Sequence, residues 1–420
     1  MEHRQDRSTG ALMRALARKL ESKDVSLEVM VRDHHEDGID DPAFLERSIV
    51  EAVDRAERIG EERVEAPTRL AELLAMPALD REAAVTVDGR YKTYTLASYI
   101  LERCAKAVFH DPTLARELAR LAGSIANQTD PRTCGGMAAL ADLEAYALAM
   151  EGNALRVAGE LRDALVCFFE ARNTLERGGA DPDLAARIDL LEASLRRDFR
   201  QFPAALALLD RAEATFTSLR DSNQVARLEI IRALIYQEQR NLDRAVASLR
   251  KAVPLAVDPW IALHIRHNLI STLVVCGEAR EAAELYDQCR HLYLQFSDPL
   301  TASRRLWVEG AIARELGDLE VASRLLTEAV DKLTEHGYSY DAALAGVDLV
   351  AVYAKQGQAA EVLRVAQNLV QLFQVRKVDP EALAALKMVH EAAEREAVNL
   401  TLLAEAANRV RANRLATDAA

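Results

Sequence analysis

The stretch GDLEVASRLLTEAV, residues 317–330, decides the fold of this chain. Its Gly-Asp pair marks a turn. The residues that follow place Ala322, Leu326 and Ala329 at spacings of four and three, which puts all three on one face of a helix. The stretch therefore predicts a turn followed by an amphipathic helix. Because similar stretches recur along the chain, we expect a repeat architecture.

Six stretches align on the position of Ala322. The aligned residues are Ala164, Ala205, Ala245, Ala282, Ala322 and Val362, which lie 41, 40, 37, 40 and 40 residues apart. A large residue follows four positions later in five of them, as Phe168, Leu209, Leu249, Tyr286 and Leu326. Upstream of four of the turns stands a small residue, in Gly152, Ala193, Ala233 and Gly310. A small side chain opposite a large one lets antiparallel helices approach closely, so the pattern predicts helix pairs that stack on one another.

This pattern resembles the tetratricopeptide repeat in its small residue on the first helix, its GD or GE turn, and its Ala, large residue, Ala order on the second. The resemblance implies an all-α fold, an α-solenoid of antiparallel helix pairs, over roughly residues 138–376. Ordinary members have a period of about 34 residues, and we expect the extra residues in the links SLRDSNQVA (218–226), QFSDPLTA (295–302) and EHGYSYDAA (335–343). The longer form is similar to the repeats of bacterial signalling regulators, including peptide-pheromone sensors.

The rest of the chain is organised around this array. We expect an acidic helical and loop region at residues 1–62, a helical region with a diverged leading pair at 63–130, about six repeats at 131–376, and capping helices at 377–420. From Glu21 to Glu65 the chain has 15 acidic and 6 basic residues. This region is either a solvated tail or an acidic arm that contacts a basic groove.

Composition narrows the class of function. Lys and Arg total 53 against 66 Asp and Glu, and the resulting net charge of −13 disfavours direct binding of nucleic acid or of an anionic membrane. No run approaches the roughly 18 apolar residues of a membrane-spanning helix, and we expect no signal peptide. The five cysteines form no CxxC pair. We therefore expect a cytoplasmic protein with reduced thiols.

The sequence carries no motif of an enzyme. Phosphate-loop, dinucleotide, zinc-protease and hydrolase signatures are all missing, so we predict no enzymatic activity and no cofactor. His264 and His267 lie three residues apart on a predicted helix, and His34, His35, Glu36 and Asp37 are consecutive. Neither arrangement has the spacing of a preformed metal site, so we predict no metal.

In the tetratricopeptide family the first helix of each pair lines a concave groove, and the resemblance implies a groove with a basic face here. Its residues are Tyr146, Asn153, Arg156, Arg187, Arg197, Arg227, His264, His267, Ser271, Arg304, Trp307 and Arg314. Because Arg pairs bidentately with carboxylates, we expect an acidic or C-terminal peptide segment of a partner protein as the ligand. The same arginines could instead pair with Asp and Glu of neighbouring helices and hold the stack together. Both interpretations remain open.

These features predict a non-catalytic protein–protein interaction module, a scaffold or adaptor in bacterial regulation or signalling that docks a peptide segment in an Arg-rich concave groove. The alternative is a peptide- or ligand-sensing regulator that changes conformation to control a partner. That alternative requires a ligand with different affinities for two states of the protein.

Overall fold

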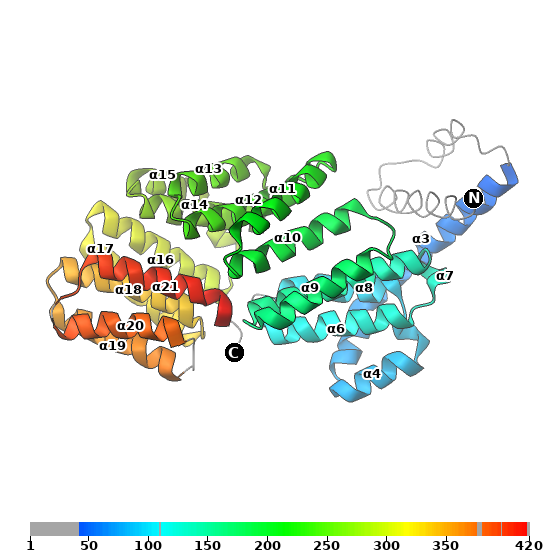
Figure 1. Cartoon of the computed structure of the whole chain (residues 1–420), viewed down its shortest axis with the longest axis horizontal. Coiled ribbons are helices and arrows are strands. Elements are labelled where there is room, and N and C mark those ends of the chain that lie inside the picture. Colours follow the sequence, from blue (N-terminus) through cyan, green and yellow to red (C-terminus); the bar gives the residue numbers. More distant parts are fainter. Residues whose placement is uncertain (1–41, 109–110, 376–379, 396, 418–420) are drawn as a thin grey trace. The chain divides into compact units, whose positions relative to one another are not determined.

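The computed structural model of the chain describes residues 42–108, 111–375, 380–395 and 397–417 (Figure 1). These residues form helices joined by short turns, and no β-strand occurs among them, which confirms the predicted all-α fold. The chain divides into two compact units: unit 1 comprises residues 1–155 and 162–188, and unit 2 comprises residues 156–161 and 189–420. Each unit is described by itself. Most of the predicted acidic arm, with His34, His35, Glu36 and Asp37, lies outside the described residues.

Unit 1 holds the first helices of the chain. They are α3 (Pro42–Leu74), α4 (Ala78–Val87), the 3-10 turn η2 (Gly89–Tyr91), α5 (Tyr94–Ala107), α6 (Pro112–Gln128), α7 (Pro131–Cys134), most of α8 (Met137–Val157), α9 (Leu161–Leu175) and the start of α10 (Pro182–Asp198). Helices α5 and α6 pack on each other, and α3 packs on α5. Side-chain caps fix where this pair begins: Thr93 accepts a hydrogen bond from the amide of Leu96, and Asp111 accepts one from the amide of Leu114.

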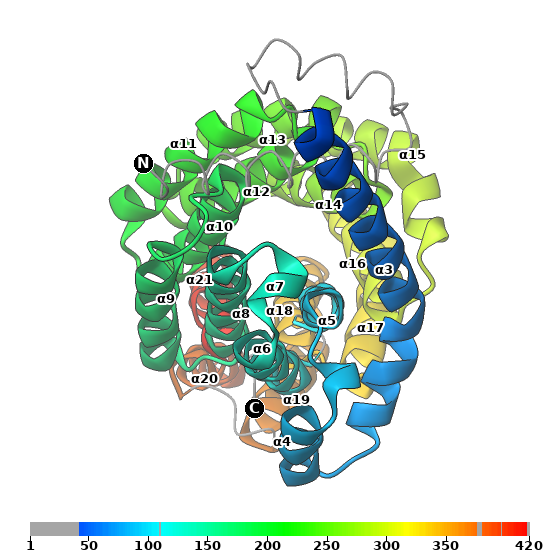
Figure 2. The same cartoon turned by 90° about the vertical axis from the view of Figure 1, so that its right-hand side faces the viewer.

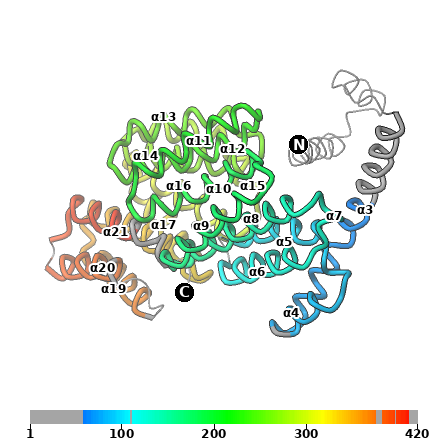
Figure 3. Tube along the Cα trace, turned by 45° about the vertical axis from the view of Figure 1, so that its right-hand side comes forward, coloured from blue at the N-terminus to red at the C-terminus, as the bar shows by residue number. Residues whose placement is uncertain are grey.

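Unit 2 continues as a row of consecutive helix pairs (Figure 3). After α10 come α11 (Phe202–Ser218), α12 (Ser222–Glu238), α13 (Leu242–Ala252), the 3-10 turn η3 (Val253–Leu255), α14 (Pro259–Val275), α15 (Ala279–Gln295), α16 (Pro299–Leu316), α17 (Leu319–Glu335), α18 (Ser339–Lys355), α19 (Ala359–Val375), α20 (Pro380–Glu394) and α21 (Leu400–Thr417). Each helix packs on the next along the chain, and α12, α14, α16 and α18 also pack on one another in that order. We call these four the inner helices, because Figure 2 shows them on the inner side of the row and α11, α13, α15 and α17 on the outer side.

The residues that carry the sequence repeat form the core of these pairs. In unit 2 the aligned alanines Ala205, Ala245, Ala282 and Ala322 are completely buried. Gly310 of α16 lies against Leu326 of α17, so closely that a Cβ at Gly310 would stand 2.8 Å from Leu326 Cγ. The contact of a small residue with a large one is therefore the one that the repeat pattern predicts.

The structure corrects the expected position of the extra residues of the long repeat. They lie in the helices and not in the links, because α11, α12, α14, α15, α17 and α18 each have 17 residues. The links 219–221, 296–298 and 336–338 have only three residues. Two features make such short links feasible: Asp221 and Asp298 cap the next helix, and Arg220 and Gly337 adopt left-handed backbone conformations that end the previous one.

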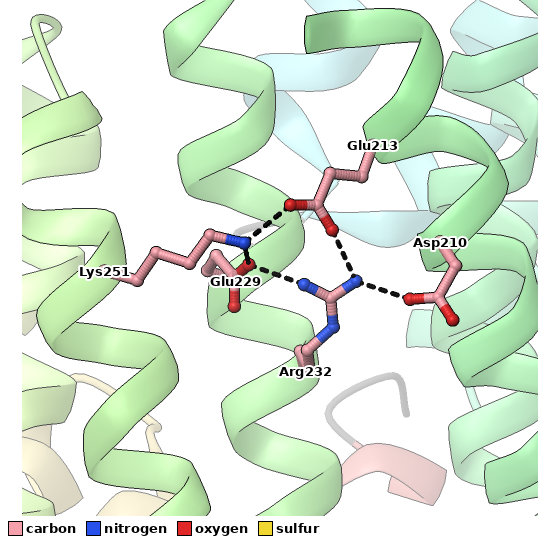
Figure 4. A network of polar contacts seen from close by, with 5 residues as sticks. All are labelled: Asp210, Glu213, Glu229, Arg232 and Lys251. Carbon is pink, nitrogen blue, oxygen red and sulfur yellow. Dashed lines mark hydrogen bonds and ion pairs between the residues drawn. The ribbon is translucent and has the colours of Figure 1, made fainter.

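A network of five charged side chains fixes the inner helix α12 between α11 and α13 (Figure 4). Arg232 Nη2 lies 2.8 Å from Asp210 Oδ1 and 2.9 Å from Glu213 Oε2, and Arg232 Nη1 lies 2.5 Å from Glu229 Oε1. Lys251 Nζ lies 2.6 Å from Glu213 Oε1 and 2.7 Å from Glu229 Oε1. Since Glu229 is almost completely buried, its carboxylate depends on these two cations for compensation.

The last helices close the row by a different packing. Helix α20 packs on α19, and α21 packs on both α20 and the inner helix α18. Leu403, Ala406, Ala407 and Val410 of α21 join the same apolar core as the buried residues of α18. Helix α18 is consequently buried along most of its length. Among the described residues, no helix has both the length and the apolar content needed to cross a bilayer.

Candidate functional site

The twelve residues predicted to line a groove are distributed over both units. Tyr146, Asn153 and Arg187 belong to unit 1, and the others belong to unit 2. In unit 1, Tyr146 is half-buried, Asn153 is buried, and Arg187 Nε lies 2.9 Å from Asp183 Oδ2 on the same helix. The other nine predicted residues lie in unit 2, which contains the inner helices.

Arg156 and Arg197 are buried in ion pairs and are not available to a ligand. Arg156 Nη1 lies 2.9 Å from Asp198 Oδ2, and Arg197 Nη2 lies 2.8 Å from Asp198 Oδ1. Arg197 also lies 3.5 Å from Glu238. All of these side chains except Glu238 are at most 5% exposed. Removing one partner would leave a buried charge, which costs about 3–5 kcal/mol, so these arginines support the stack.

Helix α16 presents three of the predicted residues, and each is bonded to an aspartate of the neighbouring inner helix α18. Arg304 Nη2 donates to Asp341 Oδ2 at 3.1 Å, and Trp307 Nε1 donates to Asp348 Oδ2 at 2.7 Å. Arg314 also pairs with Asp348. These contacts join helices one repeat apart, as the stacking interpretation predicts.

Arg227 on α12 differs from the arginines above. Its side chain is exposed, and within the described part of the chain it has no ion pair or side-chain hydrogen bond. Its positive charge is therefore available to a ligand on the inner face. Ser271, on the next inner helix, is half-buried.

A small open pocket lies between the inner helices α14 and α16. It is lined by Leu263, His264, His267, Tyr293, Thr301 and Arg304. Tyr293 comes from the outer helix α15 and is buried, and its hydroxyl lies 3.0 Å from His267 Nδ1. The pocket thus combines three predicted residues, His264, His267 and Arg304, with two polar residues that the prediction missed, Tyr293 and Thr301. The predicted set covered only first helices of the repeats, and Tyr293 lies on a second helix.

His264 is the most constrained of the pocket residues. Its Nδ1 lies 2.8 Å from the carbonyl oxygen of Trp260, and its ring meets that of Trp260 edge-on with centroids 4.4 Å apart. Trp260 in turn contacts Phe296. Burial lowers the pKa of His264, the hydrogen bond to Trp260 opposes this, and the charges of Arg304 and Arg227 lower the pKa further. His264 is therefore neutral near pH 7.

The pocket offers hydrogen-bond donors and no metal-binding cluster. Within the described residues, no group of three or more His, Cys, Asp or Glu side chains is placed to hold a metal ion. Arg304 uses Nη2 for Asp341, while its Nη1 and Nε have no partner among the described residues. Guanidinium donors of this kind match a carboxylate or a peptide carbonyl.

Comparison with known proteins supports the fold. No protein-family model and no curated protein matches this chain. A Rap protein solved in complex with competence and sporulation factor aligns with a TM-score of 0.55 and 14% sequence identity, over 76% of this chain and 87% of that one. The apo form of RapI aligns with a TM-score of 0.48 and 14% identity, over 74% of this chain and 85% of that one. The likeness to the first structure confirms the predicted fold, an α-solenoid similar to tetratricopeptide repeats.

Proposed function

We propose that the inner face of unit 2 docks a segment of a protein partner, and that this segment is acidic or ends in a C-terminal carboxylate. The observation that carries the proposal is the pocket between α14 and α16, whose Arg304 has unused donors, together with the exposed Arg227 on α12. In this reading the chain is a non-catalytic scaffold or adaptor in regulation.

The proposed binding site is smaller than the predicted groove, because several of the predicted residues already form ion pairs within the protein. Arg156, Arg197 and Arg314 are paired with carboxylates of the same unit, so they do not supply recognition. Recognition rests instead on Arg227, His264 and Arg304, which lie on three successive inner helices. The charges of both arginines act on His264.

The structural neighbour makes a regulatory role reasonable. The Rap protein of the same fold was solved in complex with competence and sporulation factor. A fold hosts many functions, so this likeness supports the proposal only together with the site in this chain.

The test begins with selection of ligands by the full chain from a displayed library of short peptides, half with free C-termini and half with internal sequences. Affinities of the selected peptides are then measured by fluorescence anisotropy for the wild type, Arg227→Glu and Arg240→Glu. Arg240 is a matched control because it is equally exposed but lies in the link after α12. We expect Arg227→Glu to weaken binding about tenfold or more and Arg240→Glu to change it by less than about twofold, with stronger binding at low salt.

Two outcomes would contradict the proposal. One is a library from which the wild type selects no peptide that contains a carboxylate. The other is equal weakening by Arg227→Glu and Arg240→Glu, which would show that binding responds to overall charge and not to the inner face.

A further inference from the structure

The hydrogen bond of His264 fixes what its ring can offer to a ligand. A carbonyl oxygen only accepts, so the 2.8 Å contact with Trp260 requires the proton of the neutral ring to be on Nδ1. The other nitrogen, Nε2, then carries a lone pair. A neutral His264 can accept a hydrogen bond at Nε2, but it can donate one to a carboxylate there only after it takes up a second proton.

The charged groups around His264 balance each other. Arg227 on α12 and Arg304 on α16 contribute two positive charges. Asp298, which caps α16 through the amide of Thr301, and Asp341 on α18, which accepts from Arg304, contribute two negative charges. Burial raises the pKa of two further neighbours, Tyr293 and Tyr338, so both are neutral near pH 7. These two positive and two negative charges therefore cancel around His264.

A carboxylate that enters this pocket brings one uncompensated negative charge into a partly buried place. The buried Leu263 and Tyr293 line the pocket and would keep water from part of the surface of the carboxylate. In such surroundings an unpaired charge is costly, and a nearby group that can become cationic compensates it. Two imidazoles line the pocket, His264 and His267, and the hydrogen bond of His264 to Trp260 leaves its Nε2 as the atom that would take up a proton.

We propose that the pocket holds one carboxylate of the docked segment against Arg304 and Thr301, and that His264 takes up a proton at Nε2 as this carboxylate enters. The proton comes from solvent, so one proton is bound for each carboxylate that binds. The inference rests on the proposed function for its biological meaning, but the pocket chemistry can be tested with small carboxylates alone.

The proposal fixes the sign of the pH dependence. In the free protein the pKa of His264 lies below its ordinary value of 6.5, and in the complex the carboxylate raises it. Binding therefore takes up a proton between these two pKa values, and affinity increases as pH falls through that window. Above both pKa values, His264 stays neutral in the complex and its contribution is lost.

The first experiment follows the histidines by NMR in the full chain carrying ¹³C at histidine Cε1, with His264→Gln to assign the signal. The pH titration is repeated in about 100 mM N-acetylalanine, which has a terminal carboxylate, in N-acetylaspartate amide, which has a side-chain carboxylate, and in chloride of equal ionic strength. We expect one of the carboxylates to raise the pKa of His264 by about 0.5–1 unit, which identifies the source of the carboxylate. The exposed His291 should not respond.

Thr301→Val tests whether the effect arises in this pocket, since Val keeps the shape of Thr and removes its hydroxyl. We expect this variant to reduce the shift at His264. An equal pKa in chloride and in both carboxylates, or a response of His291 as large as that of His264, would overturn the proposal.

The second experiment compares the affinity of a selected peptide at pH 6 and pH 8. We expect about two- to fivefold tighter binding at pH 6 for the wild type, as a pKa shift of about 0.5–1 unit implies, and no such difference for His264→Gln. If the affinity of a peptide falls in Arg227→Glu but is equal at pH 6 and pH 8, the proposed proton uptake at His264 is wrong and the proposed docking at the inner face still stands. A shift of His264 by small carboxylates without any selected peptide would support the pocket and overturn the docking function.

Discussion

A methyl group added at Gly310 would collide with Leu326. The ideal position of a Cβ at Gly310 lies 2.8 Å from Leu326 Cγ, 3.0 Å from Leu326 Cδ2 and 3.3 Å from Leu325 Cβ. Carbon atoms that are not bonded usually stay about 3.5–4.0 Å apart, so the methyl group lacks several tenths of an ångström of space. Leu326 is fully buried in the core of the α16–α17 pair, so it has little room to move away.

The expected effect of Gly310→Ala is a balance of two terms. Overpacking of a core costs about 1–3 kcal/mol. Ala in place of Gly in a helix recovers about 1 kcal/mol. We therefore expect Gly310→Ala to lower the free energy of unfolding by about 1 kcal/mol. In a Leu326→Ala background the two closest atoms, Leu326 Cγ and Cδ2, are gone, and the same substitution should stabilise the protein by up to about 1 kcal/mol.

The chain offers a selective signal for this measurement. Its two tryptophans, Trp260 and Trp307, both belong to unit 2, so urea unfolding followed by tryptophan fluorescence reports on that unit. Gly123→Ala in α6 is a control in unit 1, where a Cβ would meet Ala147 at an ordinary 3.7 Å, and its unfolding is followed by circular dichroism because unit 1 holds no tryptophan. A stabilising effect of Gly310→Ala in the wild-type background, equal to its effect in the Leu326→Ala background, would refute the reasoning.

Three further predictions use the same protein. Arg232→Met should destabilise unit 2 by about 3–5 kcal/mol in the fluorescence assay, because it leaves the buried Glu229 undercompensated, whereas Arg250→Met in an exposed pair should cost less than about 1 kcal/mol. Burial raises the pKa of Glu213, but the hydrogen bonds and charges of Lys251 and Arg232 lower this pKa by more. The Glu213 carboxylate therefore stabilises the fold above about pH 4.5, and this stabilisation is lost as pH falls through the lower pKa of the folded state. Unfolding measured over a pH series should show that Glu213→Gln loses less stability in acid than the wild type. Burial raises the pKa of the Cys104 thiol to about 12, so iodoacetamide at pH 8.5 should modify Cys104 only after unfolding, and modification of the native protein, detected by mass spectrometry, would contradict this.

The sequence was sufficient to predict the pairs of helices because the residues that carry the repeat have a local spacing. Ala322 and Leu326 lie one turn apart on one helix, and their burial follows from that spacing. The length of the links was predicted wrongly because the residues in excess of the usual period were assigned to the links and not to the helices. In the structure Gly337 and Asp221 act as caps, and a cap needs only one residue at the end of a helix.

The candidate site was only partly predictable. The repeat register identified His264, His267 and Arg304, but it does not show which arginines are neutralised by a distant carboxylate. A signal for this does exist in the sequence. Asp341 follows Arg304 by 37 residues and Asp348 follows Arg314 by 34, spacings close to one repeat, which place each aspartate on the next inner helix. Arg227 has no such aspartate one repeat later in the sequence, which distinguishes it from the arginines that form ion pairs in the stack.

The even spacing of the repeats also determines how the chain should respond to force. The aligned alanines Ala205, Ala245, Ala282 and Ala322 lie 40, 37 and 40 residues apart, so consecutive pairs store nearly equal lengths of chain. Extended chain spans about 3.3–3.6 Å per residue, so a pair of roughly 40 residues releases about 13–14 nm of contour when it is pulled apart. In single-molecule stretching, unit 2 should therefore lengthen in steps of similar size, a mechanical periodicity that repeats the one in the sequence.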